Sequence, residues 1–442
     1  MPGDISKVMS ALDKNDVGRQ VYQLISELYP VHRSITGNGF RKTMRLLRRH
    51  IPVRIHEVST GTRVFDWSVP KEWNIKDAYV KDSQGNKVID FRKCNLHIVA
   101  YSLPVKKTMS LGTLKKHLFT LPDFPDWIPY RYAFYTKTWG FCLSHNDFLK
   151  LQEGTYEVRI DSRLKKGHLT YGEYFIKGRQ AEEVLVSCHA CHPALCNDNL
   201  SGVAVAVIMA KCLSSLSLRY SYRFLFLPAT VGAITWLRRN EARLSRIKHG
   251  VVLTGLGDPG RSTYKKSRLG DTEIDRAFIH TLKNSGQDYE ILDFSPSGYD
   301  ERQFCSPGFN LPVGCLMRTP PDRYPEYHTS ADNLDFIRPA SLADSFSKCL
   351  SVISILENNR KYINLNPKGE PQLGRRGLYR TMAGQSEQPP SELALLWVLN
   401  FSDGQHSLLD IAEKSGMNFE AIRVAADLLQ KEGLIKPVFE RA

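Results

Sequence analysis

The chain has 442 residues, of which 24% are charged, and a formal net charge of +14. This length exceeds what one hydrophobic core usually serves, so the sequence predicts two or three domains. The charge leaves nucleic acid or an anionic surface open as a partner. The lysines and arginines are scattered along the chain, however, which favours a generally basic, solvated surface.

The sequence also indicates in which cellular compartment the protein is expected. No N-terminal segment shows the basic-then-apolar pattern of a secretion signal, and no apolar run reaches the roughly 18 to 20 residues that span a bilayer. The nine cysteines are odd in number and have no repeated spacing, which fits free thiols rather than a disulfide framework. We therefore expect a soluble cytoplasmic protein without membrane association.

Different patterns follow one another along the chain. Residues 16–50 predict two amphipathic helices on either side of the turn-like "PVHRSITGN". Residues 53–176 consist of short aromatic and β-branched runs broken by Pro, Gly and Asn, which predicts a small, mostly β module. After a polar connector, the last 50 residues predict a helix, a turn and a helix.

From residue 182 to residue 359 predicted strands alternate with predicted helices. The strands are "EEVLVS", "YRFLFLP", "HGVVLTGLG" and "LPVGCLMR". The helices are "SGVAVAVIMAKCLSSL", "VGAITWLRRNEARL", "DTEIDRAFIHTLKNSG" and "LADSFSKCLSVISILENN". This alternation predicts an α/β layer with a largely parallel sheet.

The stretch "VSCHACHPALCNDNLSG" carries the densest set of ligand-type side chains. His189 and His192 follow the strand "VLVS", at the carboxyl edge of the sheet, where functional groups of open α/β proteins gather. Asp198 comes directly before a helix, which Asn199 or Ser201 would cap.

A later motif, "YHTSADN", brings His328 to the same edge of the sheet after the strand "LPVGCLMR". Imidazole and carboxylate groups are zinc-type ligands, so the sequence predicts a metal site with an open position for water. An Asp before a helix is often only a cap, and a loop His is often only a surface residue, so those alternatives stay open. Cys188, Cys191 and Cys196 lack the second pair of a closed zinc site, and we expect them to be packing residues.

Several of these motifs resemble a known family. "NDNLSG" and "YHTSADN" resemble the metal motifs of zinc aminopeptidases of the M28 type. "LYPVHRSITGNG", "WSVPKEWNIKDAYV", "CHPALCNDNLSG", "GYDERQFCSPGFNLPVG" and "EYHTSADNLDF" resemble, over nearly the whole chain, a bacterial M28-like aminopeptidase family with an inserted β domain and a C-terminal winged helix.

This resemblance implies a mixed, largely parallel sheet flanked by helices, and three domains. A discontinuous peptidase-like domain would comprise residues 1–55 and 170–366. The inserted β domain would be residues 56–169, and the winged-helix domain residues 376–442.

The resemblance also implies the metal ligands. His189 would be the strand-end ligand, Asp198 the central and bridging carboxylate, and His328 the late ligand. The family has an aspartate where this chain has Cys191, so His192 would replace or supplement it. One zinc ion is favoured, and two ions are the alternative. Asp258 is the nearest further carboxylate that could bind metal, but it is equally well explained as a turn residue.

The expected general base is missing. M28 enzymes have two adjacent glutamates, one the general base and the next a metal ligand, where this chain has Ala229 and Thr230. A methyl group cannot accept a proton from the attacking water, a role typically worth about 10² to 10⁴ in rate. The chain as written is therefore expected to be a poor hydrolase. Either the activity was lost naturally, or the glutamate was deliberately changed to alanine. The otherwise intact motifs favour the deliberate change.

The motif "GYDERQF" resembles the segment that lines the substrate pocket of M28 enzymes. The residues implied in substrate binding are Tyr299, Asp300, Glu301, Arg302 and Tyr327. Asp300 or Glu301 would neutralise a free amine and Arg302 a carboxylate.

We therefore expect a metal-dependent amidohydrolase or aminopeptidase acting on a small peptide or aminoacyl-amide with a free amine, in a pocket restricted by the β insert. The main alternative is a non-catalytic protein that senses a ligand or binds DNA through the winged helix. The helix "NFEAIRVAADLLQK" holds as many acidic as basic residues, so nucleic acid is the less favoured partner. A homo-oligomer is left open.

Overall fold

The computed structural model describes the chain except for residues 1–4, 6–7, 9–10, 12, 379–391 and 439–442. It divides into two compact units, the first formed by Met1–Ile274 with Asp288–Ser347 and the second by Asp275–Gln287 with Lys348–Ala442. Among the described residues, no helix is long and apolar enough to cross a bilayer.

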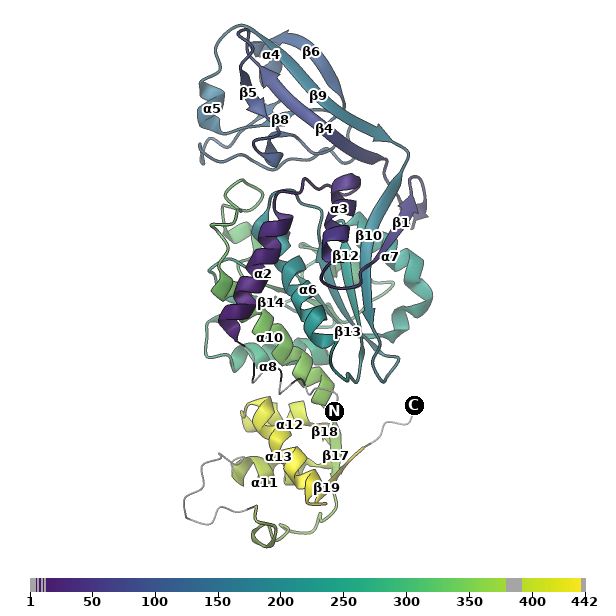
Figure 1. Cartoon of the computed structure of the whole chain (residues 1–442). Helices are drawn as coiled ribbons and strands as arrows, with labels where there is room; N and C mark the ends of the chain where they lie inside the picture. Colours follow the sequence, from purple (N-terminus) through teal and green to yellow (C-terminus); the bar gives the residue numbers. More distant parts are fainter. Residues whose placement is uncertain (1–4, 6–7, 9–10, 12, 379–391, 439–442) are drawn as a thin grey trace. The chain divides into compact units, whose positions relative to one another are not determined.

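The first unit is built on an eight-stranded sheet with the order β1-β10-β12-β11-β13-β16-β14-β15 (Figure 1). The bounds in that order are Arg54–Ser59, His168–Ile176, Ser221–Leu227, Glu183–His189, Ile247–Leu253, Val313–Met317, Ser262–Lys265 and Tyr289–Leu292. The pairs β11·β12, β11·β13, β13·β16 and β14·β15 are parallel, and the others are antiparallel. The predicted fold class, a mixed and largely parallel sheet, is confirmed.

Helices lie on both faces of this sheet. They are α2 (Lys14–Leu28), α3 (Asn38–Leu47), α6 (Gly202–Leu213), α7 (Val231–Asn240) and the short α9 (Glu301–Phe304). Helix α6 leads from β11 to β12, whereas α7 leads from β12 past β11 to β13. Because both crossovers are right-handed and run in opposite directions, α6 and α7 lie on opposite sides of the sheet (Figure 1). The carboxyl ends of β11 and β12 are thus a switch point, the place where open α/β sheets bind ligands.

The chain between β1 and β10 forms a smaller module around the antiparallel sheet β5-β4-β9-β6. Its strands are β2 (Arg63–Val64), β3 (Trp67–Ser68), β4 (Glu72–Lys81), β5 (Lys87–Asp90), β6 (Val105–Ser110), β7 (Leu118–Phe119), β8 (Phe141–Cys142) and β9 (Thr155–Lys165). Its helices are the short α4 (Leu111–Lys115) and α5 (His145–Leu149). Buried residues alternate along β9, as expected for a sheet with one covered face. The exact domain limits stay predictions.

The second unit contains α11 (Glu392–Phe401), α12 (Leu408–Ser415), α13 (Phe419–Lys431) and the sheet β18-β17-β19. These strands are Asp403–Ser407, Lys361–Asn364 and Ile435–Pro437. The predicted helix, turn and helix are confirmed: a capping box of Ser407 and Asp410 begins α12, and Gly416 in the left-handed conformation ends it. Helices α8 (Glu273–Lys283) and α10 (Pro339–Asn358) have residues in both units.

Candidate metal centre

The structure brings together the side chains that the sequence proposed as metal ligands. His189 is the last residue of β11, and its Nε2 lies 2.7 Å from Oδ1 of Asp198. The other carboxylate oxygen, Oδ2, lies 3.0 Å from Nε2 of His328 and 3.9 Å from Nδ1 of His192. Asp198 is fully buried, so it forms the centre of the cluster.

Three polar atoms of this cluster face one another without forming a hydrogen bond, which fits a cation between them. His192 Nδ1, Asp198 Oδ2 and His328 Nε2 are buried without a hydrogen-bond partner. Such atoms normally find one, because burying them without compensation costs free energy. Ligand atoms of His189, His192 and Asp198 lie within 4.8 Å of one another, so the group could hold a metal ion. Two imidazoles and a carboxylate are the donors that zinc prefers.

The charge states also suit a cation. Burial lowers the pKa of His192 to about 3, so this imidazole is neutral, the form that binds metals. Burial opposes ionisation of Asp198, but its contacts with His189 and His328 hold the pKa of this carboxyl well below its usual range.

Asp332, which sequence reasoning quoted only within a motif, fixes the backbone beside Asp198. Its carboxylate accepts hydrogen bonds from the N–H groups of Asn197 (2.5 Å) and Asp198 (2.9 Å). Asn199 Oδ1 accepts from the N–H of Gly202 at 3.1 Å, so Asn199 caps α6. Ser201 occupies the N-cap position of α6, but its hydroxyl donates to the Asn197 carbonyl at 2.7 Å and makes no cap hydrogen bond.

Asp258 has a different position from the other carboxylates. It is buried and accepts hydrogen bonds from the Asn197 side chain at 3.0 Å and from the Thr319 hydroxyl at 2.6 Å. Both carboxylate oxygens of Asp258 are therefore occupied by hydrogen bonds to neighbouring loops. Asp258 does not belong to the group of converging ligand atoms found among the described residues. The predicted packing role of the cysteines agrees with the structure, where Cys188, Cys191 and Cys196 are buried and none of the three forms a disulfide.

Ala229 lies beside the cluster. It follows β12, which pairs with β11 so that Leu227 is opposite His189. The N–H of Ala229 donates to Cys191 Sγ at 3.4 Å, between the two histidines in sequence. A longer side chain at position 229 would therefore start next to the candidate ligands.

The "GYDERQF" residues differ in what they contact. The Tyr299 ring stacks on His189 with centroids 5.2 Å apart. Asp300 is buried, and neither carboxylate oxygen has a hydrogen-bond partner; burial raises its pKa to about 7. Glu301 forms a buried ion pair with Lys265, so this carboxylate is already neutralised. Arg302 is half-buried, and its Nε has no partner.

The β module closes over the cluster through a residue that the sequence did not single out, Tyr130. Its ring lies edge-on to those of His192 (5.3 Å) and His328 (5.1 Å), and its N–H donates to the His328 carbonyl at 2.7 Å. His328 itself has a φ of 57°, a left-handed conformation that is uncommon for residues other than glycine. Tyr327 stacks on the other side of His328 at 3.9 Å. The only signal in the sequence was the aromatic run around Tyr130.

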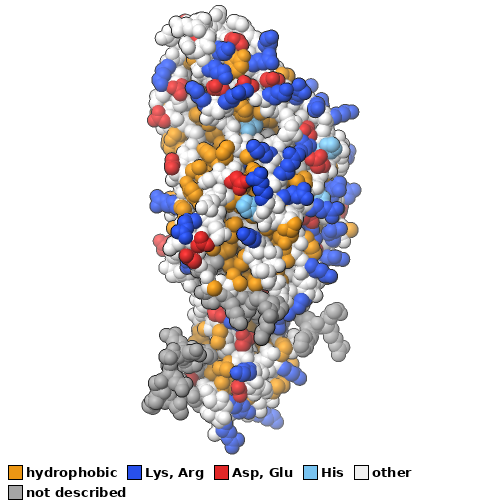
Figure 2. Space-filling view, in the orientation of Figure 1, with side chains coloured by type: hydrophobic (Ala, Val, Ile, Leu, Met, Phe, Trp, Pro, Cys, Tyr) orange, Lys and Arg blue, Asp and Glu red, His pale blue; other side chains and the backbone are white. Residues whose placement is uncertain are grey.

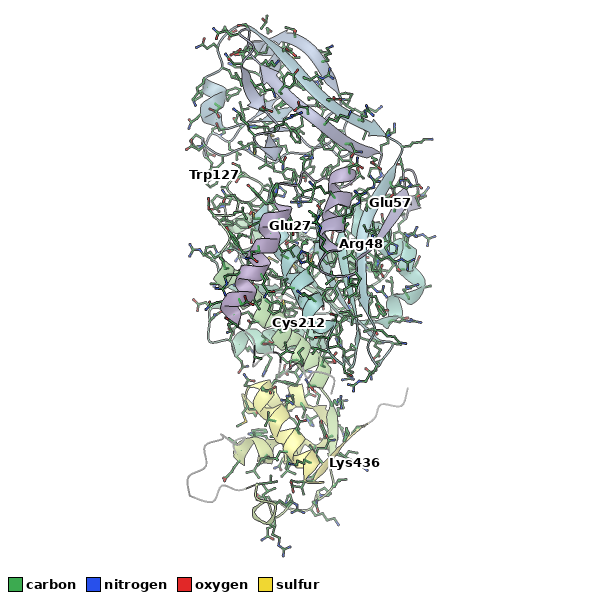
Figure 3. The ribbon with its side chains drawn as sticks, viewed as in Figure 1. Glu27, Arg48, Glu57, Trp127, Cys212 and Lys436 are labelled. Atoms are coloured by element: carbon green, nitrogen blue, oxygen red, sulfur yellow. The ribbon has the colours of Figure 1, made fainter. Side chains whose placement is uncertain are left out.

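A cavity of about 430 Å³ lies at this point, lined by residues that include Tyr130, Tyr132, Tyr327 and His328. The module loop that leads to Tyr130 carries Trp127, labelled in Figure 3. A substrate in this cavity would meet aromatic rings before it met the cluster.

Arg33, another residue that the sequence did not single out, is fully buried behind the cluster. Its Nε donates to the carbonyl of His192 at 3.1 Å, and its Nη1 to the carbonyl of Leu28 at 2.6 Å. Burial lowers the pKa of Arg33 to about 10, which still leaves it charged at neutral pH.

The sheet, its switch point and the helices around it match the fold of solved M28 zinc aminopeptidases. A zinc aminopeptidase from Bacillus subtilis superimposes with a TM-score of 0.56 at 13% identity, covering 76% of this chain and 94% of that chain. An M28 peptidase precursor from Shewanella amazonensis gives 0.56 at 13% identity, covering 80% and 97%. At 13% identity these similarities concern the fold alone, and they confirm the resemblance to the M28 type at the level of the fold.

The chain belongs to the family described as a domain of unknown function, DUF4910, whose model matches residues 22–359. A winged helix-turn-helix model matches residues 360–437, which confirms the C-terminal winged helix. A Clostridium acetobutylicum protein is 55% identical over 96% of this chain and 98% of its own; it is named as a candidate polysaccharide biosynthesis protein with an aminopeptidase-like domain. A crystal structure of a candidate peptidase from that organism has a TM-score of 0.94 at 53% identity, covering 98% and 99%.

Proposed function

We propose that this chain is a zinc-dependent amidohydrolase that cleaves an amide or peptide bond next to a free amine in a small substrate. The observation that carries the proposal is the convergence of His192 and His328 on the buried carboxylate of Asp198, where three ligand-type atoms form no hydrogen bond. One zinc ion, held by His189, Asp198 and His328 with His192 as a further ligand, would supply Lewis-acid polarisation of the scissile carbonyl.

The residues around the cluster would position the substrate. Asp300 is a buried carboxylate without a partner, so it would accept the substrate amine, whereas Glu301 is already paired with Lys265. Tyr299 and Tyr327 would orient His189 and His328 through their stacked rings. Tyr130 and its loop would exclude water and limit substrate size.

The name of the Clostridium relative suggests where such a reaction would be used. That protein is named for polysaccharide biosynthesis. We infer that the amide belongs to a small biosynthetic intermediate inside the cell. Aromatic rings such as Tyr132, which lines the cavity and is 51% exposed, would suit the apolar face of a sugar ring.

The general base is the part of the machinery that this chain lacks. A glutamate at position 229 would start beside Cys191, between the two nearest candidate ligands, and would take the proton of the attacking water. The experiment is therefore to compare the chain with the Ala229→Glu and Ala229→Gln variants on a panel of aminoacyl 4-nitroanilides.

Ala229→Glu should raise kcat/KM by about 10² to 10⁴, because general-base catalysis typically contributes that much. Ala229→Gln has the same shape but no base, so it should leave the rate unchanged. Equal rates for all three proteins on every substrate would contradict the proposal.

The second candidate function, DNA binding, rests on the winged-helix domain. The helix that would enter the groove, α13, offers little free charge, because Arg423 is paired with both Glu420 and Asp427. Figure 2 shows acidic side chains interspersed among Lys and Arg on the face in view. A steep loss of duplex binding with salt would favour this function, since phosphate contacts release counterions, and salt-insensitive or absent binding would reject it.

A further inference from the structure

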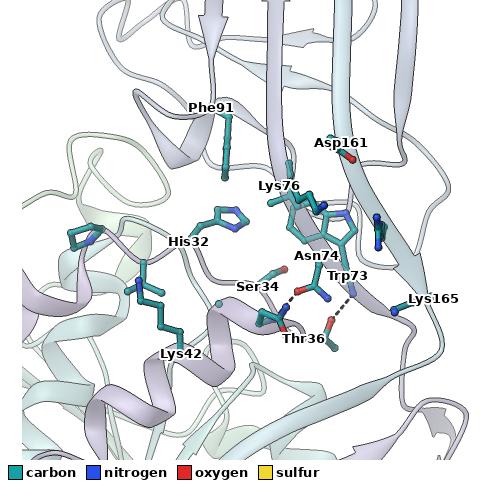
Figure 4. A pocket seen from close by; sticks show the side chains of 16 residues that line it. His32, Ser34, Thr36, Lys42, Trp73, Asn74, Lys76, Phe91, Asp161 and Lys165 are labelled. Atoms are coloured by element: carbon teal, nitrogen blue, oxygen red, sulfur yellow. Dashed lines mark hydrogen bonds between the residues drawn. The ribbon is translucent and has the colours of Figure 1, made fainter.

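A second cavity lies in the first unit, between the segment before α3 and the strands β4 and β9 (Figure 4). Its volume is about 440 Å³, and none of the candidate metal ligands lines it. Alternate residues of "HRSITGN" line one wall: His32, Ser34, Thr36 and Asn38. This motif has no part in the proposed chemistry except through Arg33.

The charge of this cavity is strongly positive. Its cationic lining residues are Lys42, Lys76, Arg163 and Lys165, all exposed. Within the described part of the chain, no ion pair involves any of them. The acidic lining residue, Asp161, is near Arg159, at 3.8 Å. Unpaired cations around a concave surface attract anions.

The floor of the cavity offers hydrogen-bonding groups without partners. Ser34 is 2% exposed and its hydroxyl has no hydrogen-bond partner, and the same is true of the buried Nε2 of His32. Figure 4 shows the Ser34 hydroxyl directed into the space beneath Lys76. Buried polar groups of this kind usually have a partner, since leaving them without one costs free energy. A ligand that enters the cavity would supply it.

The amino end of α3 faces the same cavity. Asn38 and Gly39 line it. The N-cap residue, Gly37, provides no side-chain hydrogen bond, and within the first turn the N–H of Asn38 donates to the Asn74 side chain at 2.7 Å (Figure 4). Gly37 has a φ of 96°, and a Cβ there would lie 2.2 Å from the Trp73 carbonyl, so only glycine allows this close approach to β4. The N–H groups of the first helical turn carry partial positive charge and bind phosphate in many proteins.

Planar apolar groups lie beside the cations. Phe91 and Trp73 line the cavity, and the His32 ring is 4.9 Å from that of Phe91 and 5.6 Å from that of Trp73. We propose that this cavity binds a phosphorylated ring compound of the sugar-phosphate class. The phosphate contacts Lys76, Lys165 and the amino end of α3, and the ring packs on Phe91 and His32.

The site connects to the metal centre through one residue. Arg33 lies between His32 and Ser34 in sequence and holds the carbonyl of His192. A ligand bound to both neighbours orders the backbone from which Arg33 extends. The binding site itself does not depend on the hydrolase activity proposed above.

The test is isothermal titration calorimetry of the full chain with inorganic phosphate, glucose 1-phosphate and UDP-glucose. We expect at least one ring-bearing probe to bind more tightly than inorganic phosphate. Tighter binding of glucose 1-phosphate identifies a sugar monophosphate, and tighter binding of UDP-glucose a sugar diphosphate. No binding of any probe, or inorganic phosphate binding as tightly as both others, overturns the proposal.

Substitutions in the cavity test whether the probe binds there. Ser34→Ala removes an unpartnered hydroxyl, so it should leave the melting temperature unchanged and weaken binding about fivefold to tenfold. Lys76→Glu should weaken binding more than tenfold. Ser402→Ala, at another buried unpartnered serine, and Lys107→Glu, at an exposed lysine outside the cavity, are the matched controls. Asp198→Asn should bind the probe as the unmodified chain does. Equal losses in the controls, or loss in Asp198→Asn alone, contradict this location.

Discussion

The guanidinium of Arg33 and the carbonyl of His192 are joined by a hydrogen bond of 3.1 Å, across 159 residues of sequence. Arg33→Lys should lower the affinity for zinc by about tenfold to 100-fold, as loss of outer contacts to metal ligands typically does. A lysine ammonium is a compact point charge that cannot span the carbonyls of both His192 and Leu28.

The measurement for Arg33 is the zinc dissociation constant by competition with a chromogenic chelator. Arg49→Lys, at a largely exposed arginine paired with Glu27, is the control and should bind zinc unchanged. Identical affinities in Arg33→Lys and the control would show that Arg33 does not support the metal centre.

Asp332 predicts an effect on the stability of the same loop. In Asp332→Asn, the amide NH₂ replaces one acceptor, so the N–H of Asn197 or of Asp198 loses its buried partner. We expect the free energy of unfolding to fall by about 2 to 4 kcal/mol, measured by urea denaturation. Asp335→Asn, three residues away and exposed, should change it by less than about 0.5 kcal/mol. Equal stabilities of the two variants would refute this role.

Glu72 predicts a pH dependence of stability. Arg41 bonds both of its oxygens, at 2.9 and 2.7 Å, and this contact outweighs burial to lower the pKa of Glu72 to about 2. A carboxyl whose pKa is depressed on folding contributes its full stability above its unfolded pKa of about 4.5, and loses that contribution as the pH falls toward 2.

Glu72→Gln should therefore reduce the free energy of unfolding by about 2 kcal/mol at pH 7, and the deficit should shrink between pH 4.5 and pH 2. Denaturant titrations across this range measure it. Glu153→Gln, at an exposed glutamate, is the control and should match the unmodified chain at each pH. A deficit that is independent of pH would mean that the Arg41 ion pair is not its cause.

The sequence could predict the residues of the candidate metal centre that stand at strand ends. His189, Asp198 and His328 stand directly after buried apolar strands or within short motifs, so the rule that functional groups gather at one sheet edge was enough to join them. The sequence could not predict the roles of Arg33 and Tyr130. Their contacts to His192 and His328 join residues far apart in the chain, and no local pattern marks them.

Local sequence patterns also failed to predict features that depend on tertiary contacts. Strands β14 and β15 have four residues each and no clear alternation, so the sequence did not predict them; their pairing at the sheet edge stabilises them. Glu301 was expected to bind substrate as readily as Asp300, but Lys265, 36 positions earlier, already neutralises it. The capping choice between Asn199 and Ser201 depended on the distorted turn before α6, which only the folded backbone shows.

The most direct test of the central claim is the zinc content of the purified chain, measured by mass spectrometry beside the Asp198→Asn and His328→Ala variants. Asp198 contacts His189 and His328 and lies within 3.9 Å of His192, so its loss should abolish binding. We predict about one zinc ion per chain and a marked loss of zinc in both variants. A chain without zinc even after zinc is supplied, or variants that retain it, would contradict the assignment of this cluster as a metal centre.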